Sequence, residues 1–128
     1  MIYITDAKIY PDLEPNQICL IYADSPAKAR ENYAAASAAG AQPLIVTVGP
    51  LADSDALKKL LSGINGAGVC WDISSTANAG EPARTTIKAI GRFIRAVRIN
   101  DKGQLPAFDL LKSQGFNGTV ICPAEFIE

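Results

Sequence analysis

Aspartates at the ends of short apolar runs are the residues of this chain best suited to chemistry. Asp24, Asp72 and Asp101 each stand at the end of such a run and precede a turn. In parallel α/β proteins the carboxyl ends of the strands form the functional face, so these aspartates are expected to share one polar mouth. Each of them taken alone could instead be a helix cap or a turn former.

Histidine is absent from the chain, which excludes a histidine base, a cysteine–histidine pair and histidine metal ligands. The three cysteines, Cys19, Cys70 and Cys122, each lie within an apolar stretch. An odd number of cysteines at such positions is typical of buried, reduced thiols. We therefore expect no disulfide and a cytoplasmic location.

The composition predicts one packed domain that spans residues 1–128. Of the 128 residues, 48% are hydrophobic and 20% are charged, which suits a packed core and not a disordered chain. The net charge of −1 gives no reason to expect nucleic acid or a membrane surface as a partner. No apolar run approaches the roughly 20 residues that span a bilayer.

Apolar runs and helix signals alternate along the chain. The apolar runs predict about six strands, at residues 2–5, 18–23, 44–48, 68–73, 94–99 and 119–122. Cap residues, prolines and stop glycines predict helices at residues 27–39, 56–64, 83–93 and 107–114. This order favours βαβ units and a mostly parallel sheet.

A row of basic residues is expected on the third of these helices. Arg84, Lys88, Arg92 and Arg95 follow one another at intervals of four, four and three residues, so they share one helix face. A solvated basic face is the simpler interpretation of this row, and an anion site is the sharper one.

The second half of the chain carries an ordered set of motifs. They are GVCWDISS at residues 68–75, FIRAVRIND at residues 93–101 and GFNG at residues 115–118. As a set they resemble the closing part of the xylose isomerase-like TIM barrels, a superfamily that includes sugar phosphate isomerases and epimerases. The resemblance covers residues 68–123 and implies a barrel of alternating strands and helices.

Most of that family's metal ligands are missing at the matching positions. The family holds a divalent metal with one side chain from each of four strand ends, which the resemblance matches to Gly49, Asp72, Arg98 and Pro123. Only Asp72 keeps a ligand, and Ser75 stands where the family has a substrate-contacting histidine. Because a permanently cationic arginine repels a metal ion, neither a metal nor another cofactor is expected.

Arg98 is better suited to an anion than to a metal site. Its guanidinium can bind a carboxylate or phosphate ligand, or it can form an internal ion pair with Asp72 or Asp101. Both interpretations remain open from the sequence.

The fold class expected from these patterns is α/β, with a mostly parallel sheet in a partial or reduced (β/α) TIM-type barrel of about six strands. The leading hypothesis is a degenerate, metal-free sugar isomerase/epimerase-like domain without catalytic activity. It would act as a small-ligand binding module or as an assembly module. Ser74, Ser75, Arg98 and Asn100 would then bind a sugar-like or anionic ligand at the mouth.

The alternative hypothesis is an active sugar (phosphate) isomerase or epimerase with a rearranged site. Asp72, Asp101 and Glu125 would be its acids and bases. In either case a partial barrel leaves sheet edges exposed, so a homodimer that covers them is expected.

Overall fold

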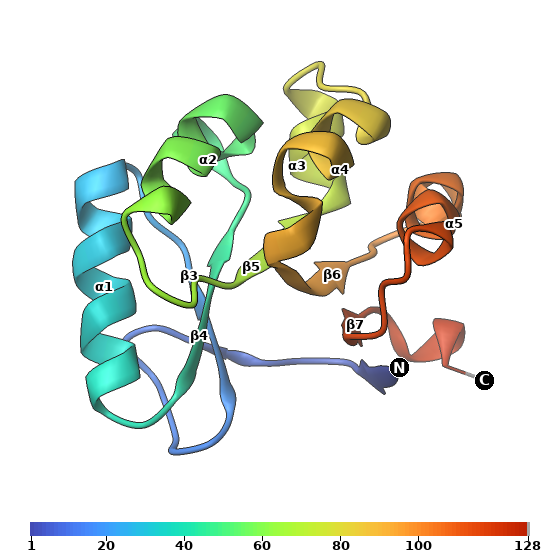
Figure 1. Ribbon diagram of the computed structural model, residues 1–128. Coiled ribbons are helices and arrows are strands. Elements are labelled where there is room, and N and C mark those ends of the chain that lie inside the picture. The colour runs from blue at the N-terminus through green and yellow to red at the C-terminus, as the bar shows by residue number, and fades with distance from the viewer. Residues whose placement is uncertain (128) are drawn as a thin grey trace.

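The computed structural model describes residues 1–127, which form an α/β fold around one sheet (Figure 1). The strands are β1 (Ile2–Ile4), β2 (Lys8–Ile9), β3 (Ile18–Ile21), β4 (Gln42–Val46), β5 (Val69–Asp72), β6 (Ile94–Arg98) and β7 (Thr119–Ile121). The α-helices are α1 (Pro26–Ala38), α2 (Ser54–Ser62), α3 (Ile73–Asn78), α4 (Ala83–Ile90) and α5 (Leu105–Ser113). Short 3-10 turns are η1 (Gly49–Ala52), η2 (Gly91–Phe93), η3 (Lys102–Gln104) and η4 (Ala124–Phe126).

All strand pairings are parallel, and the strand order is β1-β7-β6-β5-β4-β3-β2. The sheet is curled into a half-barrel, and helices alternate with its strands (Figure 1). The alternation and the parallel sheet expected from the sequence are therefore confirmed. Within residues 1–127 no helix is long and apolar enough to cross a membrane.

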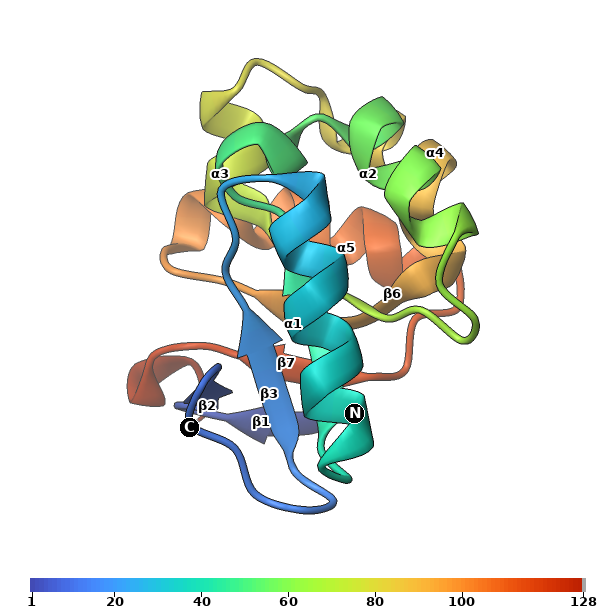
Figure 2. The ribbon, with the colours of Figure 1, turned by 90° about the vertical axis from the view of Figure 1, so that its left-hand side faces the viewer.

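The two edge strands are the two halves of one N-terminal segment. β1 pairs with β7 and β2 pairs with β3, although only residues 5–7 separate β1 from β2. Further hydrogen bonds extend both pairings. The N–H of Cys122 donates to the carbonyl of Ile4 at 3.0 Å, and the N–H of Tyr10 donates to the carbonyl of Leu20 at 2.9 Å. The segment thus links both edges of the curled sheet, as Figure 2 shows beside β3 and β7.

Alternate residues along the strands pack into two separate cores. One core lies between sheet and helices, where Trp71 and Val97 meet helix residues such as Leu57 and Ile90. The other core contains no helix residue among its buried members, which are Leu20, Leu44, Val46, Cys70, Ala96 and Ile121. Because these strand residues alternate with those of the first core, they line the concave face of the half-barrel. We call them the concave core.

The structure corrects three details of the sequence prediction. The run at residues 68–73 ends as a strand at Asp72, and α3 begins directly after it instead of a loop. The strand β2 is only two residues long, too short for its apolar pattern to be recognised. The helix predicted at residues 83–93 ends at Ile90, so Arg95 lies on β6 and not on a basic helix face.

Gly118, just before β7, leaves no room for a side chain. A Cβ at this position would lie 2.3 Å from the carbonyl oxygen of Arg95 and 2.8 Å from the ring of Phe116. We expect Gly118→Ala to lower the free energy of unfolding by about 1–3 kcal/mol, because β7 must move away from β6. Urea denaturation followed by circular dichroism measures this change.

Gly91→Ala is the matched control. Its Cβ would lie 3.4 Å from the Ile87 side chain, an ordinary contact, and its φ of −51° suits any residue. We expect this variant to change the free energy of unfolding by less than about 0.5 kcal/mol. Equal losses in the two variants would contradict the close approach of β7 to β6.

Candidate functional site

The carboxyl ends of β3, β5 and β6 bring three polar side chains to one mouth of the half-barrel. Tyr22, Asp72 and Arg98 each follow a concave-core residue by two positions, so they lie on the same face of the sheet. Asp72 and Arg98 are direct partners in the pairing of β5 with β6. We call these three residues the mouth cluster. The structure therefore brings together two of the residues that the sequence singles out.

Arg98 is half-buried and is held by a hydroxyl. Its Nη1 donates a hydrogen bond to the Tyr22 Oη. Among residues 1–127, no ion pair within 4.0 Å joins Arg98 to a carboxylate. Of the two interpretations of Arg98, the ion pair with Asp72 or Asp101 is therefore wrong.

Asp72 is 8% exposed and is fixed by the surrounding backbone. Its Oδ1 accepts a hydrogen bond from the N–H of Ser75 at 3.2 Å and so caps α3. The Asp72 N–H donates to the Oγ1 of Thr47, a buried residue just after β4, at 2.9 Å. The helix-cap interpretation of Asp72 is thus confirmed: α3 holds its carboxylate, and Thr47 holds its backbone N–H.

Burial and nearby charges change the acidity of two groups here. Burial raises the pKa of Tyr22; the charge of Arg98 lowers it, whereas Cys70 and Asp72 raise it further. Burial likewise raises the pKa of the Cys70 thiol to about 12, with Asp72 adding to the effect and Arg98 opposing it. At neutral pH both groups therefore keep their protons, so the Tyr22 hydroxyl remains a hydrogen-bond donor.

A pocket of about 470 Å³ adjoins the mouth cluster on the side of α1. Tyr22, Lys28 and Asn32 line it from one side, and the turn at Gly49 after β4 lines it from the other. Asp24 is also in its lining. Gly49, which the resemblance matches to a metal-binding glutamate, has a φ of +56° and no side chain to offer. The pocket therefore presents an ammonium, a carboxylate, an amide and a phenol to a ligand.

The other site residues predicted from the sequence are more scattered. Ser74 is half-buried on α3. Asn100 is exposed, and its backbone N–H donates a hydrogen bond to the Gln104 side chain. Asp101 is exposed and accepts a hydrogen bond from the N–H of Gly103 at 2.8 Å. Glu125 is exposed in η4. Among the described residues no hydrogen bond joins Asp101 or Glu125 to Asp72.

Sequence reasoning missed Tyr22, Lys28 and Thr47. The run at residues 18–23 shows no polar alternation, so it does not reveal that Tyr22 faces the same side as Leu20. Counting by twos from the buried leucine would have found it. Nothing in the sequence indicates that Thr47 binds the backbone of Asp72, because β4 and β5 are far apart along the chain.

The described part of the chain contains no group of three or more His, Cys, Asp or Glu side chains arranged to hold a metal ion. That the site works without a metal remains a prediction, which depends on the motif resemblance to the sugar isomerases. The three cysteines are free and buried, as expected from their apolar surroundings.

No protein-family model matches the chain, and the curated proteins and solved structures compared with it give no match either. The resemblance to xylose isomerase-like barrels therefore depends on the motifs at residues 68–123.

The buried Cys70 thiol makes stability depend on alkaline pH. Because its pKa rises from 9.0 to about 12 in the fold, its contribution is complete below pH 9 and is lost as the pH rises toward about 12. From pH 7 to pH 10.5 we expect this thiol to remove about 2 kcal/mol from the free energy of unfolding. Urea denaturation at the two pH values measures the loss.

In Cys70→Ala, the fall in the free energy of unfolding between pH 7 and pH 10.5 should be smaller by about 2 kcal/mol. Cys19 and Cys122 remain in both proteins, so their own titrations cancel in the comparison. Identical pH dependence in the two proteins would show that the Cys70 proton is not held by burial.

Proposed function

We propose that this chain is a reduced TIM-type barrel, related to the sugar isomerases and epimerases, that binds a small anion at its mouth without a metal and without catalysis. The observation that carries the proposal is the hydrogen-bond partner of Arg98. This half-buried guanidinium takes a hydroxyl, and not a carboxylate, as its partner. It lies where the resembled family places a metal ligand.

The curled sheet supports the reduced-barrel part of the proposal. Because β1 and β2 belong to one N-terminal segment that meets both β7 and β3, they act as one strand that joins the two edges. The sheet then has about six strand positions in place of the eight of a full barrel.

The chemistry of the mouth cluster favours an anion. A guanidinium carries five N–H donors, and only the one on Tyr22 is engaged with a side chain of the described residues. The Tyr22 hydroxyl accepts this bond and keeps its own hydrogen, since its pKa is raised by burial. A phosphate or carboxylate bound where the mouth cluster meets the adjoining pocket could accept from both groups. The lining of that pocket adds one cation, Lys28, and one carboxylate, Asp24.

The carboxylates of the site support binding more than catalysis. Asp72 caps α3, and Asp101 is engaged with the backbone of η3. An isomerase needs an acid and a base that face one substrate, at hydrogen-bond distance from its reacting atoms. The exposed Glu125 of η4 has no hydrogen bond to either aspartate among residues 1–127.

Isothermal titration with glucose 6-phosphate, inorganic phosphate and glucose tests the proposal. We expect the two phosphates to bind and glucose to bind much more weakly. Arg98→Gln should weaken phosphate binding roughly tenfold, because one charge-assisted interaction is removed. Tyr22→Phe should weaken it by a smaller factor.

Arg92→Gln is the control for this experiment. It removes the same charge from an exposed residue in η2, at the opposite end of β6 from Arg98. Its affinity should stay within about twofold of the parent. Equal weakening by Arg92→Gln and Arg98→Gln, or equal binding of glucose, would refute the anion site. Conversion of glucose 6-phosphate, followed by proton NMR, would refute the absence of catalysis.

We further propose a homodimer formed through the N-terminal segment. Ile2 and Ile9 are 66% and 46% exposed, and they lie on the two edge strands. Sedimentation equilibrium should show a dimer at about 100 µM, which Ile2→Lys shifts toward the monomer because edge charges disfavour strand pairing. A parent protein that stays monomeric at this concentration would contradict the dimer.

A further inference from the structure

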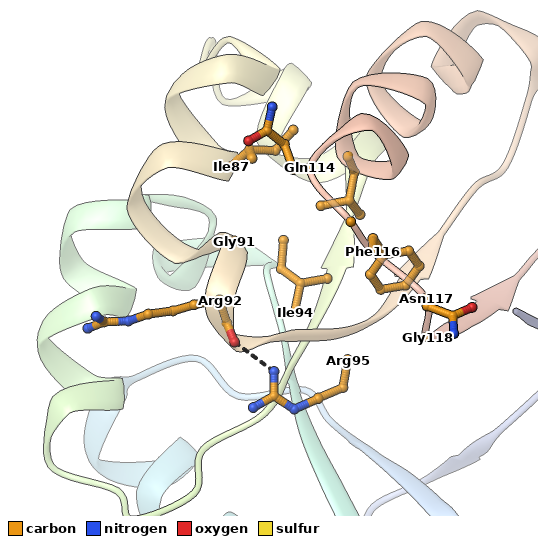
Figure 3. A pocket seen from close by; sticks show the side chains of 11 residues that line it. Ile87, Gly91, Arg92, Ile94, Arg95, Gln114, Phe116, Asn117 and Gly118 are labelled. Carbon is orange, nitrogen blue, oxygen red and sulfur yellow. Dashed lines mark hydrogen bonds between the residues drawn. The ribbon is translucent and has the colours of Figure 1, made fainter.

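A second pocket lies at the end of the sheet opposite the mouth cluster. It occupies about 490 Å³ between the C-terminal ends of α4 and α5, above the beginning of β6. Ile87, Ile94, Leu111 and Phe116 give it apolar walls, as Figure 3 shows for the three that it labels. Gln114 lies at the upper rim of the pocket and Arg95 at its lower rim (Figure 3). A volume of this size suits a small organic molecule.

Arg95 places a positive charge at the rim of this pocket. The pairing of β5 with β6 shifts by one residue here, so that Arg95 is the extra residue between Ile94 and Ala96. A bulge of this kind redirects a side chain out of the regular alternation. Its Nη1 donates to the carbonyl oxygen of Arg92 at 2.7 Å (Figure 3), which fixes the guanidinium at the lower rim.

Two glycines make the space that Arg95 occupies. A Cβ on Gly68 would lie 3.2 Å from the Arg95 Cγ, and a Cβ on Gly118 would lie 2.3 Å from the Arg95 carbonyl oxygen. Arg95 also lines a further cavity of about 320 Å³ on the side of β4. Its side chain is thus seated between neighbouring strands, although it remains exposed to solvent.

No carboxylate neutralises this arginine. The linings of both cavities contain no Asp or Glu from the described residues. Within residues 1–127, Arg95 makes no ion pair within 4.0 Å. Arg92 also belongs to the lining, but its guanidinium points away from the pocket (Figure 3) and lies 4.7 Å from the Phe93 ring centre.

We propose that this pocket binds a small organic anion, in which a carboxylate or phosphate is joined to an aromatic or aliphatic body. The anionic group pairs with the free N–H donors of Arg95 at the lower rim (Figure 3). The apolar body lies against Ile87, Ile94 and Phe116. This site is independent of the mouth cluster, because the five residues of β6 place about 13 Å of strand between Ile94 and Arg98.

Two-dimensional ¹⁵N NMR with phenyl phosphate, inorganic phosphate and benzyl alcohol tests this site. The glycine amides report which cavity is filled: Gly91 and Gly115 line this pocket, and Gly49 lines the pocket at the mouth. We expect phenyl phosphate to shift the Gly91 and Gly115 signals in a saturable way. Phosphate without the ring and ring without the phosphate should each bind at least about fivefold more weakly.

Variants of the two arginines supply the control. Arg95→Gln should weaken binding of phenyl phosphate at Gly91 and Gly115 roughly tenfold, and Arg95→Lys should restore part of it. Arg92→Gln removes the same charge but should stay within about twofold of the parent, since its guanidinium is held on Phe93.

Circular dichroism melting curves confirm that each variant is folded before it is titrated. Three results would overturn the proposal. They are shifts confined to Gly49 or to Gly66 and Gly68, equal affinity for benzyl alcohol, and unchanged affinity in a folded Arg95→Gln protein.

Discussion

The fold depends on filling the concave face of a parallel sheet that helices cover on the other side only. A parallel sheet is stable when both faces are buried, and the helices of this chain pack with the first core alone. The curl solves this problem because the concave side chains pack against one another. Cys70 and Ala96 are small at the centre, and the N-terminal segment adds Ile4 and Ala7. That segment therefore supplies hydrogen bonds to both edges and also apolar side chains to the concave core.

The same curl decides what the two ends of the sheet can do. Side chains two positions beyond the concave core must point into the mouth, which is how Tyr22, Asp72 and Arg98 meet there. At the other end, the pairing of β6 with β5 shifts by one residue at Arg95, which lies at the rim of a pocket between α4 and α5. A single strand, β6, thus presents one arginine at each end.

Much of this architecture could be predicted from the sequence, because it depends on local signals. The cap Ser25 before α1, the cap Asp53 before α2 and the apolar runs of β3 to β7 are all visible in the residue order. The strand β2 and the bulge at Arg95 could not be predicted, since both are defined by pairing with other strands. The helix α3 was hidden because Trp71-Asp72-Ile73 continues an apolar run, while its cap is the Asp72 side chain.

Of the candidate site, the sequence correctly indicated the strand ends and the role of Asp72 as a cap, but not the partner of Arg98. Tyr22 reaches Arg98 across two intervening strands, and only the curl brings them together. The chain has 12 basic and 13 acidic residues, so its charges balance overall. They do not balance locally: the ion pairs of the described residues are Lys8–Glu14, Lys28–Glu31 and Lys112–Asp109, all well exposed.

Asp72 lies beside Arg98 at the mouth, but its Oδ1 caps α3 and forms no ion pair with Arg98 among the described residues. Other acids lie in caps and on outer helices. Glu81 shows the pattern, because it accepts hydrogen bonds from the N–H and the hydroxyl of Ser54 and from the Thr86 hydroxyl. It thereby ties the beginning of α2 to α4 and is not available to a cation. A half-buried guanidinium without a carboxylate loses hydration and gains little in return. This is the physical reason for the anion proposed at Arg98, which would supply charge from solvent without changing the fold. Arg95 is exposed, so the site proposed there depends on its unpaired N–H donors beside an apolar pocket.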